Sequence, residues 1–116
     1  MNELIETIFN NFKVDGVEIP VAFLKYEGHD EPYITYQQTD IDNSYSGDDE
    51  LLGYVYYYDF DIYSKSDYTN IIRSVKQLLK ENDFEWQPSQ SSSDMYENDT
   101  GYYHKTLSFA YLKGVN

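Results

Sequence analysis

The chain has 116 residues, a length that fits one domain built around one hydrophobic core. It contains no cysteine, which excludes disulfide bonds, thiolate nucleophiles and cysteine-ligated zinc and is compatible with a reducing cytosol. Its 21 acidic and 8 basic residues give a net charge of -13, so the average field repels phosphate and argues against a nucleic acid wrapped on the surface.

The acidity has three interpretations. It can simply keep the protein in solution, it can form an acidic lumen or face within an assembly, or it can mimic DNA in an inhibitor. The N-terminal sequence MNELIETIFNNF carries acids where an export signal carries Lys or Arg, and no apolar run approaches the roughly 20 residues that cross a bilayer. We therefore expect a soluble protein without a membrane span or an export signal.

The first predicted element is a helix over residues 2–12. Its apolar residues have the spacing of one helix face, and they are Leu4, Ile5, Ile8, Phe9 and Phe12. Gly16 then acts as a helix breaker. Residues 18–26 predict a short strand in which Pro20 must lie at the beginning or at a sheet edge, because proline has no N–H to donate. Residues 27–32 predict a turn.

Two strands and an exposed loop follow. Residues 33–41 predict a strand, and residues 42–50 (DNSYSGDDE) are small, polar and acidic, as in the tip of a hairpin. Residues 51–63 alternate over their whole length, and one apolar or aromatic face contains Tyr54, Tyr56, Tyr58, Phe60 and Ile62. A strand of this length extends roughly 40 Å, so we expect part of the hairpin to project as an arm.

A second helix is predicted over residues 68–79, with Ser66 or Asp67 as its cap. Its apolar stripe contains Tyr68, Ile71, Ile72, Val75, Leu78 and Leu79. The opposite side carries a basic ridge at i, i+3 and i+7, formed by Arg73, Lys76 and Lys80. The ridge is either an ordinary solvated helix face or a docking surface for the acidic face of a neighbouring copy or partner.

The last part of the chain predicts a short strand over residues 84–87, a loop over residues 88–94 and a strand over residues 102–112. No internal repeat is present. The order of helix, three strands, helix and two strands predicts a single α+β domain over residues 1–116. We expect a mixed, mostly antiparallel sheet of four to five strands with both helices packed on one face.

The sequence holds no catalytic motif that we can identify. The two histidines are His29 and His104, and no serine lies in a G-x-S-x-G elbow, so a Ser or Cys triad is not predicted. His29 lies among acids that could hold a metal, but an exposed loop histidine is the simpler interpretation, and we interpret His104 as structural. Glycine-rich phosphate loops are absent. We expect no enzymatic activity, no cofactor and no metal.

Two groups of carboxylates need an interpretation of their own. The alternate oxygen ligands of a calcium loop are matched by Asp40, Asp42 and Ser44. The match then fails, because Tyr45 stands where the loop needs glycine and Leu51 stands where it needs glutamate. Asp59 and Asp61 share a strand face, as paired carboxylates do in glycosidases, but a solvated or interface face is the simpler interpretation.

Taken in order, the segments of the chain resemble the small tail-completion and tail-terminator proteins of long-tailed phages that infect Gram-positive hosts. The resemblance covers most of the chain and rests on the amphipathic N-terminal helix, EPYITYQQTD at 31–40, the acidic loop with YYYDFDIYSKSD before the second helix, and YENDTGYYHKTLSFAY at 96–111. The order of the pieces is more telling than any one piece.

The resemblance implies a virion protein that forms a ring, commonly a hexamer, on the head-proximal end of the tail tube. Such a ring ends tube polymerisation and contacts the tube protein and the head-completion or connector protein, while the genome can pass through its lumen. The protein is then made in the host cytoplasm, with no membrane and no sequence-specific nucleic acid among its partners. The expected interface residues are Asp48, Asp49, Glu50, Tyr56, Tyr58, Arg73, Lys76 and Lys80.

Two other functions fit the same sequence. Another neck component, such as a head-closure protein, has the same physical demands. An acidic DNA-mimicking inhibitor of a host nuclease would instead form a stoichiometric complex with a basic enzyme.

Overall fold

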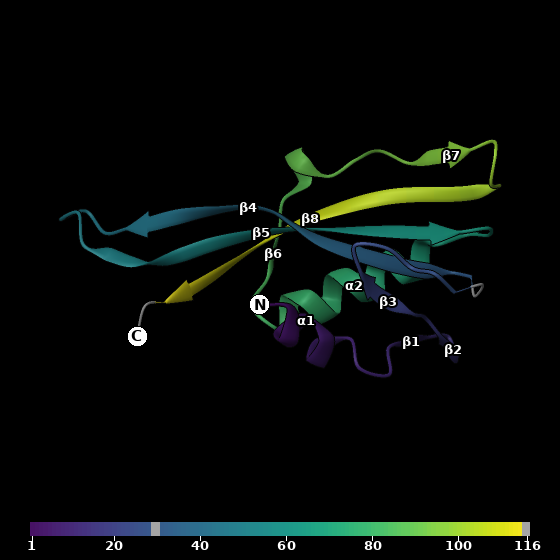
Figure 1. Ribbon diagram of the computed structural model, residues 1–116, viewed down its shortest axis with the longest axis horizontal. Coiled ribbons are helices and arrows are strands. Elements are labelled where there is room, and N and C mark those ends of the chain that lie inside the picture. Colours follow the sequence, from purple (N-terminus) through teal and green to yellow (C-terminus); the bar gives the residue numbers. More distant parts are fainter. Residues whose placement is uncertain (29–30, 115–116) are drawn as a thin grey trace.

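The computed structural model describes residues 1–28 and 31–114, so the interpretation of His29 lies outside the described residues. The described elements are α1 (Asn2–Ile8), β1 (Lys13–Val14), β2 (Val17–Glu18), β3 (Val21–Phe23), β4 (Tyr33–Tyr45), β5 (Leu51–Ser64), α2 (Thr69–Glu81), β6 (Glu85–Trp86), the 3₁₀ helix η1 (Pro88–Gln90), β7 (Met95–Glu97) and β8 (Tyr102–Gly114). The molecule is elongated, with extents of 51, 27 and 23 Å, and its long strands run along the longest axis (Figure 1).

One large sheet organises the described part of the chain. Its strands follow the order β3-β4-β5-β8-β6, and β7 also pairs with β8. β3 lies parallel to β4, and the other pairings in this sheet are antiparallel. The predicted α+β fold with a mixed, mostly antiparallel sheet is confirmed, although the sheet has six strands rather than four or five and β1 pairs with β2 in a small separate sheet.

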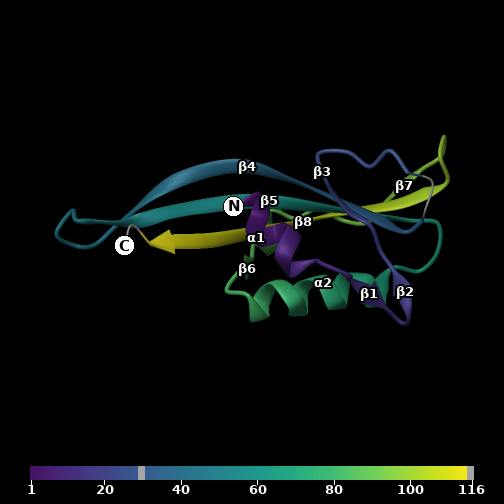
Figure 2. The same ribbon diagram turned by 60° about the horizontal axis from the view of Figure 1, so that its bottom comes forward.

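Both helices cover the same face of the large sheet (Figure 2). Successive side chains of a strand point to opposite faces, so alternate residues of β4, β5 and β8 meet the helices. The centre of this core is Phe60, whose ring centroid lies 5.7 Å from that of Phe9 and 5.7 Å from that of Phe109. Ile5 from α1 and Val75 and Leu79 from α2 are fully buried against this face.

The N-terminal helix is shorter than the sequence predicts. α1 ends at Ile8, and Asn11 has a positive φ of 56°, which asparagine tolerates better than most residues and which turns the chain away from the helix axis. Phe12 still belongs to the core, because the turn returns its ring to 5.2 Å from that of Phe9.

The strand predicted over residues 18–26 is divided at Pro20. Glu18 belongs to β2, whereas Val21–Phe23 forms β3 on the edge of the large sheet. Pro20 lies directly before β3, and its carbonyl accepts a hydrogen bond from the N–H of Ile34. The position of Pro20 at the beginning of an edge strand agrees with the prediction.

The second helix agrees with its predicted limits to within two residues at either end. α2 spans Thr69–Glu81 and presents Ile71, Val75 and Leu79 to the core. The N-cap is Tyr68 and not the predicted Ser66 or Asp67, and its side chain forms no cap hydrogen bond. Asp67 still accepts hydrogen bonds from the N–H and the hydroxyl of Thr69 at the helix start, and these bonds lower the pKa of its carboxyl.

The hairpin loop after β4 and the segment after α2 both contain more regular structure than was predicted. β4 continues to Tyr45, so only residues 46–50 form the hairpin loop instead of residues 42–50. η1 lies within the loop predicted over residues 88–94, and the short strand β7 lies beyond that loop, in residues for which no element was predicted. β7 and β8 are joined by a tight turn in which Gly101 has a φ of 76°.

Candidate functional site

The outer halves of β4, β5 and β8 form an arm that extends beyond the helices (Figure 1). We define the arm as residues 40–57 and 110–114. Ile41 lies opposite Tyr56, and Tyr56 lies opposite Tyr111, so the arm is a three-stranded continuation of the main sheet. The projecting arm was expected from the length of the strand predicted over residues 51–63. The pairing of β8 along the arm as a third strand was not predicted.

Large apolar side chains lie exposed on the arm. Five of them are between 37% and 56% exposed, namely Ile41, Tyr45, Leu52, Tyr54 and Leu112. The strand register and the alternation of side chains place Ile41 and Tyr54 on the helix side of the sheet and Leu112 on the other side. The arm therefore exposes apolar side chains on both of its faces, and exposed apolar surface that is contiguous marks interaction sites.

Two aspartates cap the free edge of the arm. β3 pairs with β4 only between Ile34 and Tyr36, so among the described residues the outer edge of β4 has no strand partner along the arm. Asp40 Oδ1 accepts a 2.8 Å hydrogen bond from the N–H of Ile41, and Asp42 Oδ1 accepts a 2.9 Å bond from the N–H of Asn43. These carboxylates satisfy the edge donors and place negative charge where another strand would otherwise pair.

The same aspartates explain the resemblance to a calcium loop. Their alternate spacing follows from the period of an extended strand, in which every second residue points to one face. Among the described residues, no group of three or more His, Cys, Asp or Glu side chains is arranged to hold a metal ion.

The tip of the arm is an acidic turn. Asp48, Asp49 and Glu50 are all exposed, and none of them forms an ion pair with the residues that the structure describes. The turn is closed by backbone hydrogen bonds from Ser46 to Glu50 and from Asp49 to Ser46, with Asp49 at a φ of 61°. The three acids therefore form a fixed negative end of the molecule.

The two tyrosines expected at an interface have different positions. Tyr58 is only 1% exposed, and its hydroxyl donates a 3.0 Å hydrogen bond to Asn2 Oδ1 of α1. It is a core residue, so the expectation that Tyr58 contacts another chain does not fit the structure. Tyr56 lies one step further out, half-buried at the base of the arm. Alternation predicts that both residues share a face but does not show where the helices cease to cover it.

Only part of the basic ridge of α2 is exposed to solvent. Arg73 and Lys80 are exposed, and neither forms an ion pair within residues 1–28 and 31–114. Lys76 is half-buried, with its Nζ 3.5 Å from the centroid of the Trp86 ring. Burial, helped by the nearby charge of Lys105, lowers the pKa of the Lys76 ammonium. The ridge thus has two free cations and one that is bound to an aromatic ring.

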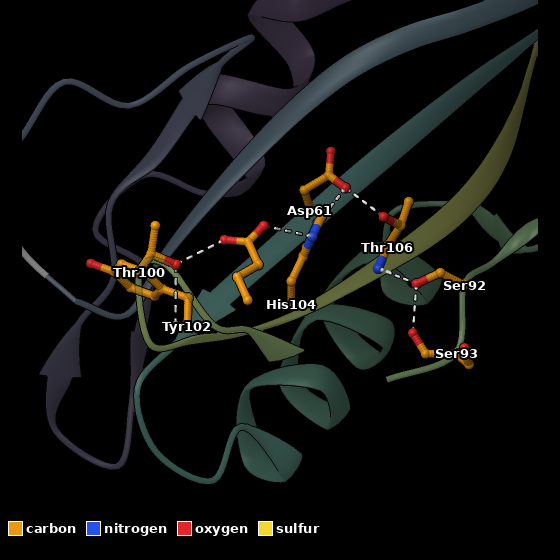
Figure 3. Close-up of polar contacts among 8 residues, drawn as sticks. Asp61, Ser92, Ser93, Thr100, Tyr102, His104 and Thr106 are labelled. Carbon is orange, nitrogen blue, oxygen red and sulfur yellow. Dashed lines mark hydrogen bonds and ion pairs between the residues drawn. The ribbon is translucent and has the colours of Figure 1, made fainter. Parts of the chain in front are cut away.

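Asp61 is the centre of a polar network on the sheet face opposite the helices (Figure 3). Its Oδ1 lies 3.0 Å from Nε2 of His104 and accepts a hydrogen bond from the hydroxyl of Thr106. The other ring nitrogen of His104 lies 3.8 Å from Glu97 Oε2, so the histidine connects β5 to β7 through β8. This network connects the hairpin of β7 and β8 to β5, in agreement with a structural role for His104.

Asp59 lies on the same face of β5 as Asp61. Its Oδ1 accepts a hydrogen bond from the hydroxyl of Ser108, whose Oγ also lies 3.0 Å from the carbonyl oxygen of Gln90. Burial raises the pKa of the Asp59 carboxyl, the hydrogen bond from Ser108 opposes the rise, and the charge of Asp61 adds to it. Both carboxylates are thus occupied by neighbouring side chains and are not fully solvated.

A stack of aromatic rings next to this network was not predicted. Tyr33, Tyr63 and His104 lie directly opposite one another on β4, β5 and β8. The ring centroids of Tyr33 and Tyr63 are 4.8 Å apart, and those of Tyr63 and His104 are 4.2 Å apart. Burial, with the charge of Asp61, raises the pKa of Tyr63 to about 12. The residues are distant in sequence, so only the strand register brings them together.

No protein-family model matches the chain, and no curated protein matches it. None of the helices in the described residues is long and apolar enough to cross a membrane.

Proposed function

We propose that this chain is a structural protein of a tailed-phage virion. It forms a ring at the head-proximal end of the tail tube, where it ends tube polymerisation and helps to join the head. Its partners are other copies of itself, the tube protein and a head-completion protein. The pattern of segments described above is the source of the specific assignment, and the geometry of the chain supports a function in assembly.

The observation that carries the proposal is the arm. It exposes Ile41, Tyr45, Leu52, Tyr54 and Leu112 on a rigid extension of the sheet. A chain that acts alone gains nothing from this exposure, whereas an apolar surface with a polar rim is typical of protein interfaces. The charged groups also favour contacts between copies. The acidic tip and the basic ridge are far apart on one chain, so they can meet only between two chains.

The net charge is compatible with a ring around the genome. With a charge of -13 on each chain, a closed ring accumulates strong negative potential. A lumen of this sign repels DNA and lets it slide, because phosphates find no cationic contacts.

The decisive experiment removes the protein from the phage that encodes it and compares the particles by electron microscopy. Overlong tails, or finished tails without heads, are expected. Heads that leak DNA and carry no tails would instead assign the chain to head closure, and particles of normal appearance would contradict both neck functions. Mass spectrometry of purified virions provides the first control, because a component of the ring must be present in every particle, in the few copies that one ring contains.

A second experiment tests the inhibitor alternative. The purified chain is passed over immobilised host nucleases, and bound complexes are weighed by light scattering. The virion proposal predicts no stoichiometric complex with any nuclease. A tight complex in a fixed ratio would contradict the proposal, because DNA mimicry then accounts for the acidity.

A further inference from the structure

A groove lies between α2 and β6 at the base of the arm. It has a volume of about 310 Å³ and is lined by Lys76, Lys80, Phe84, Glu85, Trp86 and Phe109. Phe84 and Phe109 are buried and form an apolar floor, while Trp86 is 42% exposed. The indole is fixed by a 3.0 Å hydrogen bond from its Nε1 to Ser91 Oγ. This volume is at the lower end of ligand pockets and suits one or two side chains.

The rim of the groove is mainly cationic. Lys80 is exposed and forms no ion pair within the described residues, and Lys76 lies over the Trp86 ring at 3.5 Å. Arg73 continues the same side of the helix one turn earlier. Glu85 is the single acid among the lining residues, so the rim retains an excess of positive charge. An apolar floor with a basic rim favours an occupant that is apolar and acidic.

The tip of the arm has that composition. Tyr45 and Leu52 are 56% and 48% exposed and flank the acidic turn. Asp48 and Glu50 lie in the turn itself, between these two residues in the sequence. An aromatic or aliphatic anchor surrounded by charge is the usual form of a contact that fills a small pocket.

The tip cannot reach the groove of its own chain. In Figures 1 and 2, the turn between β4 and β5 lies at the far end of the arm, whereas β6 lies where the arm leaves the body. β4 and β5 remain paired on both sides of the register shifts at Gln38/Asp40 and Ser44/Tyr45, and β8 pairs with β5 as far as Gly53, so this pairing holds the tip away from the body. Any contact between these two surfaces therefore joins two copies.

We propose that the tip of the arm of one copy docks into the groove between α2 and β6 of the next. Tyr45 or Leu52 fills the apolar floor beside Trp86, and the acids of the turn contact Lys80 and Lys76. Each copy then offers one tip and one groove, so the contact is head-to-tail and either closes a ring or continues as a filament. This inference rests on the proposed function, since it names the contact by which the copies assemble.

The absence of cysteine permits a direct test by cross-linking. One variant carries Asp48→Cys at the tip, and a second carries Lys80→Cys on the groove. Asp49 is left unchanged because its φ is positive. The control carries Asp99→Cys, an exposed acid in the turn between β7 and β8 at the opposite end of the molecule. The two tested variants are mixed under mild oxidation, and heterodimer formation is measured over time.

The proposal predicts that Asp48→Cys forms a disulfide with Lys80→Cys at least tenfold faster than Asp99→Cys does. It also predicts that the fluorescence of Trp86, the single tryptophan, changes with the cross-link. Equal rates for the two acidic turns would overturn the proposal, whatever the oligomeric state of the protein. The particle phenotype of the deleted phage is independent of this rate, so the inference can fail while the proposed function stands.

A charge exchange provides the second measurement. The tip variant Asp48→Lys/Glu50→Lys and the groove variant Arg73→Glu/Lys80→Glu are each checked for an unchanged circular dichroism spectrum. Each should associate less than the parent chain when alone, because like charges then face each other. The two mixed together should associate again, since every tip then meets a groove of opposite sign in an alternating arrangement. A mixture that associates no better than its components contradicts head-to-tail docking.

Discussion

Removal of the arm should separate assembly from folding. Ile41 and Tyr56 lie directly opposite each other on β4 and β5. Residues 42–55 can therefore be replaced by Asn-Gly, the sequence that favours a two-residue hairpin turn between paired strands. The shortened chain keeps the body of the sheet and both helices intact.

The expected change in stability is small, because the removed segment contributes nothing to the buried core. Its half-exposed side chains each contribute about 1 kcal/mol, roughly half the value of full burial. Ordering of the removed residues opposes folding, and the hydrogen bonds that they form offset that cost. These effects act against each other and no core side chain is lost, so the free energy of unfolding should change by less than about 2 kcal/mol and the Tm by less than about 10 °C.

Urea unfolding followed by circular dichroism measures this change, and sedimentation velocity measures association. Phe60→Ala is the reference for true core damage and should cost about 3 to 5 kcal/mol, since Phe60 is fully buried. A loss of more than about 3 kcal/mol in the shortened chain would refute the division between arm and body. Association equal to that of the parent would refute the assignment of the arm to assembly.

Three further substitutions test single contacts. Tyr58→Phe removes the hydrogen bond to α1 and should cost about 1 kcal/mol in urea unfolding, whereas Tyr56→Phe, at the half-buried base of the arm, should cost less. Gly53→Ala should lower the free energy of unfolding by about 1 to 3 kcal/mol and speed amide exchange at the end of β8, because an added Cβ meets the backbone of that strand. Unchanged amide exchange would contradict the close approach of the two strands at Gly53. Burial raises the folded-state pKa of Asp59, so the parent protein loses stability as the pH rises through that pKa. Asp59→Asn should therefore be more stable than the parent at pH 7, and this difference in the free energy of unfolding should shrink on acidification. A difference that grows on acidification would show that the direction of the pKa shift is wrong.

Local periodicity predicted the elements whose structure follows from the spacing of apolar side chains within the element itself. Ile71, Val75 and Leu79 recur at helical spacing, and α2 has nearly the predicted limits. The alternation in residues 51–63 predicted β5 in the same way. Pro20 predicted either the beginning of a strand or a sheet edge, because the missing N–H acts at one position regardless of the rest of the fold.

Features that depend on pairing between distant residues could not be predicted. His104 lies near Asp61 only because β8 pairs with β5 in one register, and a shift by one residue would move the ring to the other face. β7 is too short for any periodic pattern, and its strand character comes from its pairing with β8. Tyr58 was assigned to an interface because the sequence does not show how far the helices extend along the sheet.

The continuity of β5 from the tip of the arm into the core has a mechanical consequence. The strand is paired with β8 from Gly53 to Ser64 and with β4 on both sides of two register shifts, and its hydrogen bonds lie across the long axis. A force that pulls on the tip along this axis therefore loads many hydrogen bonds in shear at once, and it does not open them one after another. Strain applied at the end of the arm reaches Phe60 and the helices directly, so the arm behaves as a stiff beam anchored in the core.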